Sequence, residues 1–276
     1  MKKNIAFLGP IGTYTEQAAF SYAPDQIRTP LETIKEVTKS IENGEFDECV
    51  LPIENSLGGT IIEVIDYLIS SKKTQIKNEL MLEIKHCLIS KTILQLSEIK
   101  VIKSKFEAFQ QCKTFIDTYL PKAKLISTSS TAAAVNELIN GENFTVAIGP
   151  KRAAQLANLP IVKESIQDKN NNITRFVVLS KNDHEPTKDD KTSIAFEFGS
   201  DSPGLIYSTL KPFSDKNINL TKIESRPTGK GLGSYFFLID FEGHKNEPII
   251  SETLKEIKKH MINFKILGSY PKGKLP

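Results

Sequence analysis

The chain has 276 residues, of which 39% are hydrophobic and 25% are charged, the balance of an ordinary folded protein with its own core. At about 100–200 residues per domain, this length favours two domains. The formal net charge of +3 comes from scattered lysines and argues against a nucleic-acid-binding protein, and the longest apolar runs are too short to span a membrane.

The N-terminal residues predict a strand, not a signal peptide. Lys2 and Lys3 precede an apolar run, but that run stops at Gly9-Pro10 and no small-residue cleavage site follows. We therefore expect the protein in the cytoplasm. No histidine and cysteine spacing typical of a metal site is present, so we expect no metal. Reduced, buried thiols are expected for the three widely spaced cysteines, Cys49, Cys87 and Cys112.

Strands and helices are predicted to alternate over the first 180 residues. Thr13 and Glu16 match a capping box, which predicts that a helix opens after the strand at 4–9. Isoleucines and leucines recur at helical spacing over 61–69, and hydroxyl residues precede three alanines in a helix predicted over 129–138. This alternation predicts the α/β class with largely parallel sheets. Further strands are predicted at 48–53, 82–90, 99–103, 124–127, 144–149 and 173–180.

The polar stretch 181–191 contains a proline and no apolar period, which indicates a linker between domains. Beyond it, the element order β-α-β-β-α-β is typical of a ferredoxin-like domain. We expect its first helix to begin with Ser202 as N-cap and Pro203 in the first turn. The remaining elements are predicted as strands at 192–199, 218–225, 234–241 and 264–270, and a helix with Ile250, Leu254, Ile257 and Met261 on one face.

Three segments combine hydroxyls, amides or carboxylates with tight turns at the ends of predicted strands: 9–16, 52–60 and 170–176. Ligands of α/β proteins bind at the carboxyl ends of strands, and helix N-termini there offer free N–H groups to anions. Each segment alone also fits an ordinary turn or helix cap. His86 is more typical of a strand residue with a backbone partner than of a catalyst, and Cys112 is more typical of the core.

Several short motifs gain meaning from their order along the chain. They are Gly9-Pro10 with Gly12-Thr13, "PIENS" at 52–56, "STAAA" at 130–134, "NNITRF" at 171–176, "SPGLIYSTL" at 202–210 and "ESRP" at 224–227. Taken together, these motifs resemble the prephenate dehydratase family over nearly the whole chain, with the last two in an ACT-type domain. In one segment the family commonly shows Ser-His-Pro-Gln ahead of Gln-Cys. Here that segment, 104–112, keeps Ser104, Gln111 and Cys112 but carries Lys105, Phe106 and Glu107 in the middle.

The resemblance implies an α/β catalytic domain of two lobes, similar to a periplasmic binding protein, with the site between the lobes. It implies a monofunctional enzyme, because no chorismate mutase segment precedes Met1. The implied boundaries are a catalytic domain at 1–182 (lobe 1 about 1–80 and 165–182, lobe 2 about 81–164), a linker at 183–191 and an ACT regulatory domain at 192–276.

The activity implied is the decarboxylating dehydration of prephenate to phenylpyruvate in L-phenylalanine biosynthesis, with feedback by L-phenylalanine. Aromatisation drives the reaction, so no cofactor is expected. The protein has to protonate or hydrogen-bond the departing hydroxyl. It must also hold a dianion without clamping the ring carboxylate, whose charge disperses in the transition state. Neutral hydroxyls and amides suit that task better than a ring of lysines.

By the resemblance, Thr174 is the first candidate for the proton donor and Asn55 lies in the same catalytic set, while Glu54 is the runner-up because a carboxyl group is the more obvious acid. Strand alternation turns Arg175 away from a cleft that Thr174 faces. Arg175 is therefore either a carboxylate binder on irregular backbone or a structural anchor. The substrate-binding candidates are Thr13, Ser56, Ser104, Gln111, Ser130, Thr131, Arg175 and Phe176.

ACT-like domains pair across subunits and bind amino acids at the shared interface, which implies a homodimer or homotetramer. The effector positions implied for L-phenylalanine are Gly204, Leu205, Ile206, Glu224, Ser225, Arg226 and Pro227. Two alternatives stay open at this point. One is an arogenate dehydratase, with the same chemistry on an amino-bearing substrate. The other is a non-enzymatic binding and sensing protein of two lobes, which the "TRF" segment and the missing secretion signal disfavour.

Overall fold

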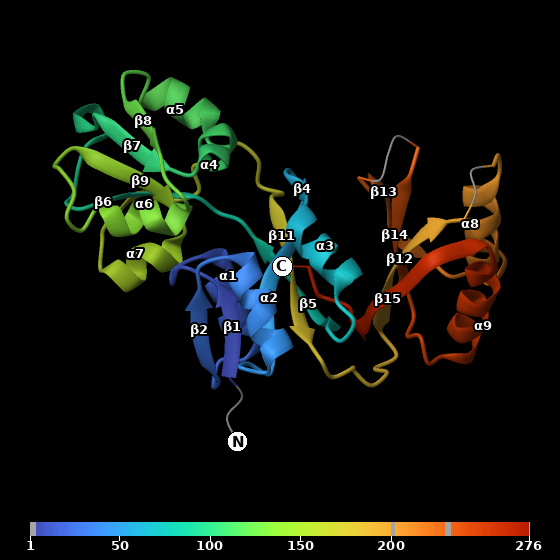
Figure 1. Cartoon of the computed structure of the whole chain (residues 1–276). Helices are drawn as coiled ribbons and strands as arrows, with labels where there is room; N and C mark the ends of the chain where they lie inside the picture. The colour runs from blue at the N-terminus through green and yellow to red at the C-terminus, as the bar shows by residue number, and fades with distance from the viewer. Residues whose placement is uncertain (1–3, 200–201, 230–232, 276) are drawn as a thin grey trace. The chain divides into compact units, whose positions relative to one another are not determined.

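The computed structural model describes residues 4–199, 202–229 and 233–275 (Figure 1). The chain divides into two compact units. Unit 1 consists of Met1–Ile61, Leu80–Phe176 and Leu275–Pro276, and unit 2 consists of Ile62–Glu79 and Val177–Lys274. Each unit therefore combines segments that are far apart in the sequence, and each is described by itself below.

The first sheet contains the strands that the predicted segments 9–16 and 52–60 follow and that the segment 170–176 enters. Its elements are β1 (Asn4–Leu8), β2 (Ile27–Leu31), β3 (Glu48–Asn55), β4 (Gly59–Thr60), β5 (Gln75–Glu83) and β11 (Ile173–Ser180), with helices α1 (Tyr14–Tyr22), α2 (Ile34–Asn43) and α3 (Ile62–Ser70). The strand order is β2-β1-β3-β11-β5, and β1 pairs in parallel with β2 and β3. The short β4 folds back antiparallel onto the end of β3. As predicted, Thr13 caps α1 by accepting a hydrogen bond from the backbone of Glu16.

The second sheet lies in unit 1 and is mixed. Its elements are β6 (Cys87–Ser90), β7 (Val101–Ser104), β8 (Lys124–Ser127), β9 (Thr145–Gly149) and β10 (Ile161–Lys163), with helices α4 (Phe106–Gln111), α5 (Lys113–Tyr119), α6 (Thr131–Glu137) and α7 (Lys151–Ala157) and a 3-10 turn at Leu96–Glu98. The order is β10-β6-β9-β7-β8, in which β6 runs antiparallel to both neighbours and β7 runs parallel to both of its neighbours.

Alternation along β9 explains why helices cover both faces of this sheet. Val146 and Ile148 pack with α4 and α5 on one face, whereas Ala147 packs with α6 and α7 on the other (Figure 1). Gly149 allows α6 to approach the sheet closely, because a Cβ there would lie 2.5 Å from the Val135 side chain. Helices therefore cover both faces of the second sheet. Its strand β9 needs this cover, because side chains on both of its faces are buried.

The C-terminal sheet has the predicted ferredoxin-like layout. Its elements are β12 (Asp190–Phe198), α8 (Leu205–Asp215), β13 (Leu220–Pro227), β14 (Tyr235–Glu242), α9 (Pro248–Ile257), a 3-10 turn (Lys258–His260) and β15 (Met261–Pro271). The strand order is β13-β14-β12-β15 with antiparallel pairs throughout, and α8 packs against α9. Its core is formed by aromatic and branched side chains, including Phe196, Phe213, Phe241, Ile250 and Leu254.

Three local predictions were wrong. The apolar run at 82–90 is not one strand, because β5 ends at Glu83 in the first sheet and β6 begins at Cys87 in the second. The helix α8 does not begin at Ser202: its N-cap is Gly204 in the left-handed region with a φ of 89°. Met261 is not on the last helix but opens β15, where it still packs against the same core. The elements β2, α2 and α7 were not predicted, although α2 places Val37 and Ile41 on one buried face.

In unit 2, the segment from α3 to Glu79 is bonded to the strands of the C-terminal sheet. Lys191 of β12 forms a buried ion pair with Glu79, with Nζ 2.8 Å from Oε1, and the backbone N–H of Gly273 donates to the same oxygen at 2.9 Å. Gly268 of β15 faces Ile76 so closely that a Cβ there would lie 2.2 Å from the Ile76 carbonyl oxygen. These contacts explain why residues 62–79 belong to the same compact unit as the C-terminal sheet.

We expect Glu79→Ala to be strongly destabilising, by about 3–5 kcal/mol, because it leaves the Lys191 ammonium buried without its partner. Chemical denaturation monitored by circular dichroism measures this loss. Removing both charges in the Glu79→Leu, Lys191→Met double variant should recover much of it. The exposed pair of Lys113 and Asp117 supplies the control, since Asp117→Ala should leave stability unchanged. A wild-type denaturation midpoint for Glu79→Ala would contradict this account of unit 2.

Candidate functional site

The candidate site begins at a turn that is held by the side chain of Asn55. The Asn55 Oδ1 atom accepts hydrogen bonds from the backbone N–H groups of Leu57 at 3.0 Å and Gly58 at 2.8 Å. Ser56 ties the same turn to the start of β11, because its Oγ accepts from the Ile173 N–H at 3.0 Å and donates to the Asn171 carbonyl at 3.1 Å. The turn after β3 and the entry into β11 therefore form one hydrogen-bonded piece.

The orientation of the Asn55 amide is fixed, since backbone N–H groups can only donate. Its Nδ2 must then face the other way, and it donates to Asn172 Oδ1 at 2.7 Å and to Thr174 Oγ1 at 2.8 Å. The Thr174 hydroxyl therefore accepts a bond from Asn55 and keeps its own hydrogen to donate. Thr174 is 7% exposed, so this hydroxyl sits in a largely desolvated place.

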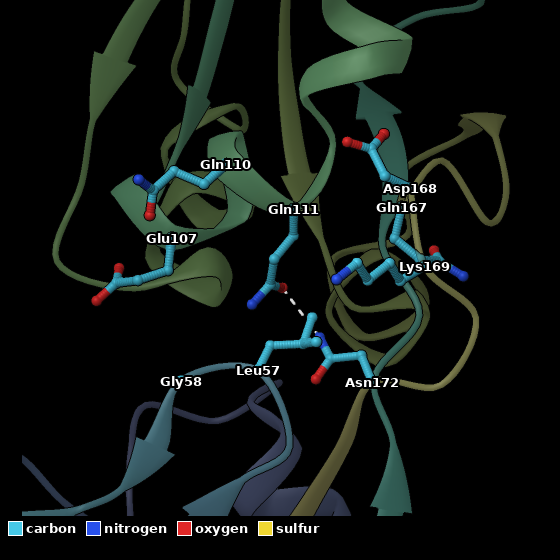
Figure 2. Close-up of a pocket in the computed structure, with 9 residues that line it drawn as sticks. All are labelled: Leu57, Gly58, Glu107, Gln110, Gln111, Gln167, Asp168, Lys169 and Asn172. Atoms are coloured by element: carbon cyan, nitrogen blue, oxygen red, sulfur yellow. Dashed lines mark hydrogen bonds between the residues drawn. The ribbon is translucent and has the colours of Figure 1, made fainter.

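The same reasoning identifies each donor in a series of side-chain hydrogen bonds that continues from Asn172 to Gln111 of α4 and to His86. Because Asn172 accepts through Oδ1, its Nδ2 is the donor to Gln111 Oε1 at 3.1 Å, the bond drawn in Figure 2. Gln111 Oε1 also lies 2.7 Å from His86 Nε2. Since Oε1 can only accept, His86 must be the tautomer that carries hydrogen on Nε2.

The His86 imidazole is buried and neutral. Burial lowers its pKa, an effect that the hydrogen bond to Gln111 only partly opposes. Among the described residues, its buried Nδ1 has no hydrogen-bond partner. The rings of Tyr14 and His86 form a T-shaped pair with 6.3 Å between their centroids, and the Tyr14 hydroxyl donates to the Lys85 carbonyl at 2.5 Å. Burial likewise raises the pKa of the Tyr14 phenol above its usual range, so both rings stay uncharged.

A cavity of about 400 Å³ in unit 1 adjoins this chain of hydrogen bonds. Side chains from both sheets line it, and most of them are neutral. Its lining comprises Thr13, Tyr14, Thr15, Pro52, Asn55, Gly58, Gly59, Thr60, Ile61, Ile84, His86, Lys105, Glu107, Ala108, Gln111, Thr131, Asn172, Thr174 and Phe176.

A second hollow of about 320 Å³ shares Gly58, Glu107, Gln111 and Asn172 with the first, so the two adjoin at the Gln111–Asn172 bond (Figure 2). This second hollow is lined by more charged groups. Its other lining residues are Leu57, Gln110, Gln167, Asp168 and Lys169.

Six of the residues singled out from the sequence meet at the larger cavity: Thr13, Asn55, Gln111, Thr131, Thr174 and Phe176. Their hydroxyls are not equally available. Thr13 Oγ1 donates to the Pro10 carbonyl at 2.9 Å and caps α1, so its hydrogen is already used. Phe176 is 1% exposed and offers an apolar face to a ring.

Glu54 and Arg175 lie elsewhere. Arg175 is 7% exposed and its Nη1 is 3.5 Å from Glu54 Oε2. Neither side chain is among the described residues that line the two hollows. Thr174 and Phe176 face the cavity while Arg175 turns away, which is the alternation expected of a regular strand. The guanidinium keeps the Glu54 carboxylate bound on the far side of β3 and β11.

Three serines predicted to bind substrate form hydrogen bonds within the scaffold instead. None of them is among the described residues that line either hollow. Ser56 joins the turn to β11, as given above. Ser104 is fully buried and donates to the Ile148 carbonyl at 2.7 Å. Ser130 caps α6 by accepting from the Ala133 N–H at 3.0 Å.

Sequence reasoning did not single out several residues that line the larger cavity, among them Asn172, His86, Tyr14 and Lys105. Asn172 stood inside a recognised motif but was not singled out, and His86 was assigned to a strand. The apolar neighbours of His86 gave no signal, because its partner Gln111 is 25 residues away along the chain. Tyr14 and Lys105 each lie next to a singled-out residue, Thr13 and Ser104. Adjacent positions were passed over because their directions depend on how α1 and α4 begin.

The predicted effector residues lie in the C-terminal sheet and its first helix. Gly204 precedes α8, where Ile206 is 46% exposed. Ser225 and Pro227 are exposed on β13, whereas Arg226 is engaged. Its guanidinium binds the Asp66 carboxylate of α3 with both nitrogens, one of them 2.6 Å from Oδ2. This ion pair lies within unit 2.

Among residues 4–199, 202–229 and 233–275, no group of three or more histidine, cysteine or acidic side chains is arranged to hold a metal ion. Over the same residues, no helix is long and apolar enough to cross a membrane. All three cysteines are free and buried.

Comparison with known proteins identifies the family. Residues 5–184 match the family model of prephenate dehydratase, and residues 192–259 match that of the ACT domain. The chain is 37% identical over 275 residues to a bifunctional chorismate mutase/prephenate dehydratase of Aquifex aeolicus, a match that covers 99% of this chain and 75% of the relative. It is 37% identical over 279 residues to a prephenate dehydratase of Methanocaldococcus jannaschii, with 98% of this chain and 99% of the relative covered.

A solved structure of prephenate dehydratase in complex with L-Phe from Arthrobacter aurescens superposes with a TM-score of 0.89 at 32% identity, covering 98% of this chain and 90% of that one. The chain therefore belongs to the prephenate dehydratase family and carries an ACT domain. The family, the α/β class and the lyase activity predicted from the motifs are confirmed.

His86 should make the stability depend on pH below about 6.5, the ordinary pKa of histidine. There the unfolded chain binds a proton, while the folded chain stays neutral at His86 because burial lowers its pKa. The unfolded state then holds more protons, so stability falls as pH falls, by up to about 1.4 kcal/mol per pH unit from this group. Urea denaturation between pH 5 and pH 7.5 measures the slope.

Both His86→Leu and His86→Gln remove the titrating group and should flatten this slope relative to wild type. His86→Gln keeps a donor for Gln111 and should be the more stable of the two at neutral pH. An unaltered pH dependence in both variants would show that His86 carries a proton in the folded state as readily as in the unfolded one.

Proposed function

We propose that the chain converts prephenate to phenylpyruvate in the larger cavity of unit 1, with Thr174 donating its hydroxyl hydrogen to the departing ring hydroxyl. The observation that carries this assignment is the bond from Asn55 Nδ2 to Thr174 Oγ1. Since the Thr174 oxygen already accepts there, its hydrogen is directed to another acceptor. A leaving hydroxyl that gains negative charge is the acceptor that such a donor serves best.

In the proposed step, the bond between the ring and its carboxylate breaks and releases carbon dioxide. The electron pair of that bond completes the aromatic ring as the ring carbon–oxygen bond on the opposite side breaks. The departing oxygen takes up a hydrogen and leaves as water. Thr174 supplies the hydrogen bond or the proton, and solvent restores it. Asn55 supports this role, because an N–H donated to Oγ1 stabilises negative charge on that oxygen.

The neutral lining suits the loss of the ring carboxylate. A cation held against that group would stabilise the dianionic ground state more than the transition state, in which the charge disperses. Hydroxyls and amides of Thr131, Gln111 and Asn172 can orient the substrate without that cost, and Phe176 offers a face for the ring. We assign Thr13 to the support of α1 and of the cavity wall.

Glu54 is the weaker candidate for the acid. It is paired with Arg175 and is not among the described residues that line either hollow. We therefore assign Arg175 as a structural anchor and not as a carboxylate binder. We assign structural roles to Ser56, Ser104 and Ser130, because each hydroxyl is used in a hydrogen bond to the backbone.

The regulatory part of the proposal concerns the ACT domain. We propose domain boundaries at 1–182 and 192–276 with a linker at 183–191, and L-phenylalanine as an inhibitor bound at Gly204–Ile206 and Glu224–Pro227. The relative solved with L-Phe supports the identity of the effector. A homodimer or homotetramer is proposed because ACT-like sites are shared between subunits, and the free, buried cysteines support a reducing compartment such as the cytoplasm.

Thr174→Val should lower kcat for prephenate by roughly 10²–10⁴-fold, the range for loss of one general acid. KM should change little, since the contact strengthens only in the transition state. Loss of prephenate and appearance of phenylpyruvate are followed by absorbance. Thr174→Ser keeps the hydroxyl and should retain most activity, and Glu54→Gln should cost less than about tenfold. Near-normal turnover by Thr174→Val would refute the assignment.

Ile206→Glu should weaken inhibition by L-phenylalanine more than about tenfold, or 1.4 kcal/mol. It replaces apolar surface by a carboxylate that repels the carboxylate of the effector. Ile206 is 46% exposed, so the fold should tolerate the change and turnover without effector should stay at the wild-type level. Tyr207 is 68% exposed on the same helix and lies outside the proposed set; Tyr207→Glu should keep the inhibition. Equal responses of the two variants would move the effector site elsewhere.

A further inference from the structure

Lys105 is the single lysine or arginine among the described residues that line the larger cavity. The substrate of the proposed function, on which this inference rests, is a dianion. We propose that Lys105 binds the pyruvyl carboxylate of the substrate, and that Glu107 holds the Lys105 ammonium in the free enzyme until the substrate replaces it.

The position of Lys105 fits an exchangeable partner. It directly precedes α4, the helix that also carries Glu107 and Gln111, so the three side chains are set by one short element. Lys105 Nζ lies 3.2 Å from Glu107 Oε1, and the two side chains are 52% and 55% exposed. An ion pair this open to water is weak, and a carboxylate arriving in the cavity competes for the ammonium at little cost.

The chemistry of the reaction decides which carboxylate Lys105 binds. The ring carboxylate leaves as carbon dioxide, so a cation bound to it would oppose its departure. The pyruvyl carboxylate keeps its charge from substrate to product, and a cation there stabilises ground state and transition state alike. Such uniform binding lowers KM without changing kcat. Lys105 and Glu107 are the two charged residues among the described residues that line the larger cavity, and a single lysine in that lining fits the second use.

The proposed donor and Lys105 also come from elements of different sheets, and both line the larger cavity. Thr174 belongs to β11 of the first sheet, and Lys105 follows β7 of the second. In the substrate, the departing hydroxyl and the pyruvyl group sit at opposite ends of the six-membered ring. One ring spanning the cavity can therefore meet the hydroxyl donor at one end and the ammonium at the other.

Lys169 provides a matched control. It lies in the adjoining hollow and carries the same charge, and Figure 2 shows Glu107 and Lys169 on either side of Gln111. Lys169 is exposed and lines the smaller hollow but not the larger one, as the described residues define them. A variant at Lys169 therefore reports the effect of removing a nearby positive charge without removing the proposed contact.

The test is calorimetric titration of the full-length protein with phenylpyruvate, which keeps the pyruvyl carboxylate and lacks the ring carboxylate. Lys105→Gln should weaken binding by about tenfold or more, the weight of one hydrogen bond to a charged group. Glu107→Gln should tighten it, because the competing carboxylate is gone. Lys169→Gln should leave it within about twofold, the level expected of a screened charge. In turnover of prephenate, Lys105→Gln should raise KM by a similar factor with kcat unchanged.

Unaltered phenylpyruvate binding by Lys105→Gln overturns the proposal, and so does an equal loss in Lys169→Gln, which would indicate general attraction by positive charge. A drop in kcat at constant KM would make Lys105 part of the chemical step instead. Because binding is measured without turnover, a wild-type protein that binds phenylpyruvate through Lys105 but does not convert prephenate would sink the proposed function and keep this inference.

Discussion

The orientation of one side-chain amide, that of Asn55, determines which groups donate and which accept in the candidate site. Two backbone N–H groups, from Leu57 and Gly58, hold its oxygen, so its nitrogen has to point toward β11. A carboxylate at this position could accept the same backbone bonds but could not donate to Thr174. An amide can do both, which makes the residue type as important as its place.

From that fixed point, each further donor and acceptor follows without freedom of choice. Once Asn55 donates to Asn172, the hydrogen bonds from Asn172 and from His86 to Gln111 can each run in only one direction. A protonated His86 would still donate to Gln111, but it would place a charge and a second N–H where Nδ1 is buried without a partner in the described residues. Burial and the missing partner therefore favour the neutral ring, so His86 adds no charge to the cavity that it lines.

The motifs predicted the family, the order of elements and most of the residues near Asn55, because short-range signals such as caps, turns and apolar periods are local. The failures arise where tertiary context decides. The run at 82–90 is apolar throughout, yet the chain passes from one sheet to the other between Glu83 and Cys87. Ser202 and Gly204 are both acceptable N-caps, and the left-handed turn at Gly204 shortens α8. The sequence left Glu54 as runner-up for the acid, because its bond to Arg175, 121 residues away, leaves no trace in the sequence.

The contacts of α3 bear on how an effector could influence the reaction. Within unit 2, α3 is held through Asp66 by Arg226 of β13, and its last carbonyl groups accept from the Lys265 ammonium of β15. Burial lowers the pKa of Lys265, and the three carbonyl oxygens of Leu68, Ile69 and Ser71 accept from its ammonium. The residue before α3 is Ile61, which lines the cavity of unit 1. A ligand that takes Arg226 from Asp66 would thus release one of the bonds that fix α3 within unit 2. Coupling of this kind needs only that the two arrangements of Arg226 differ in affinity for the effector.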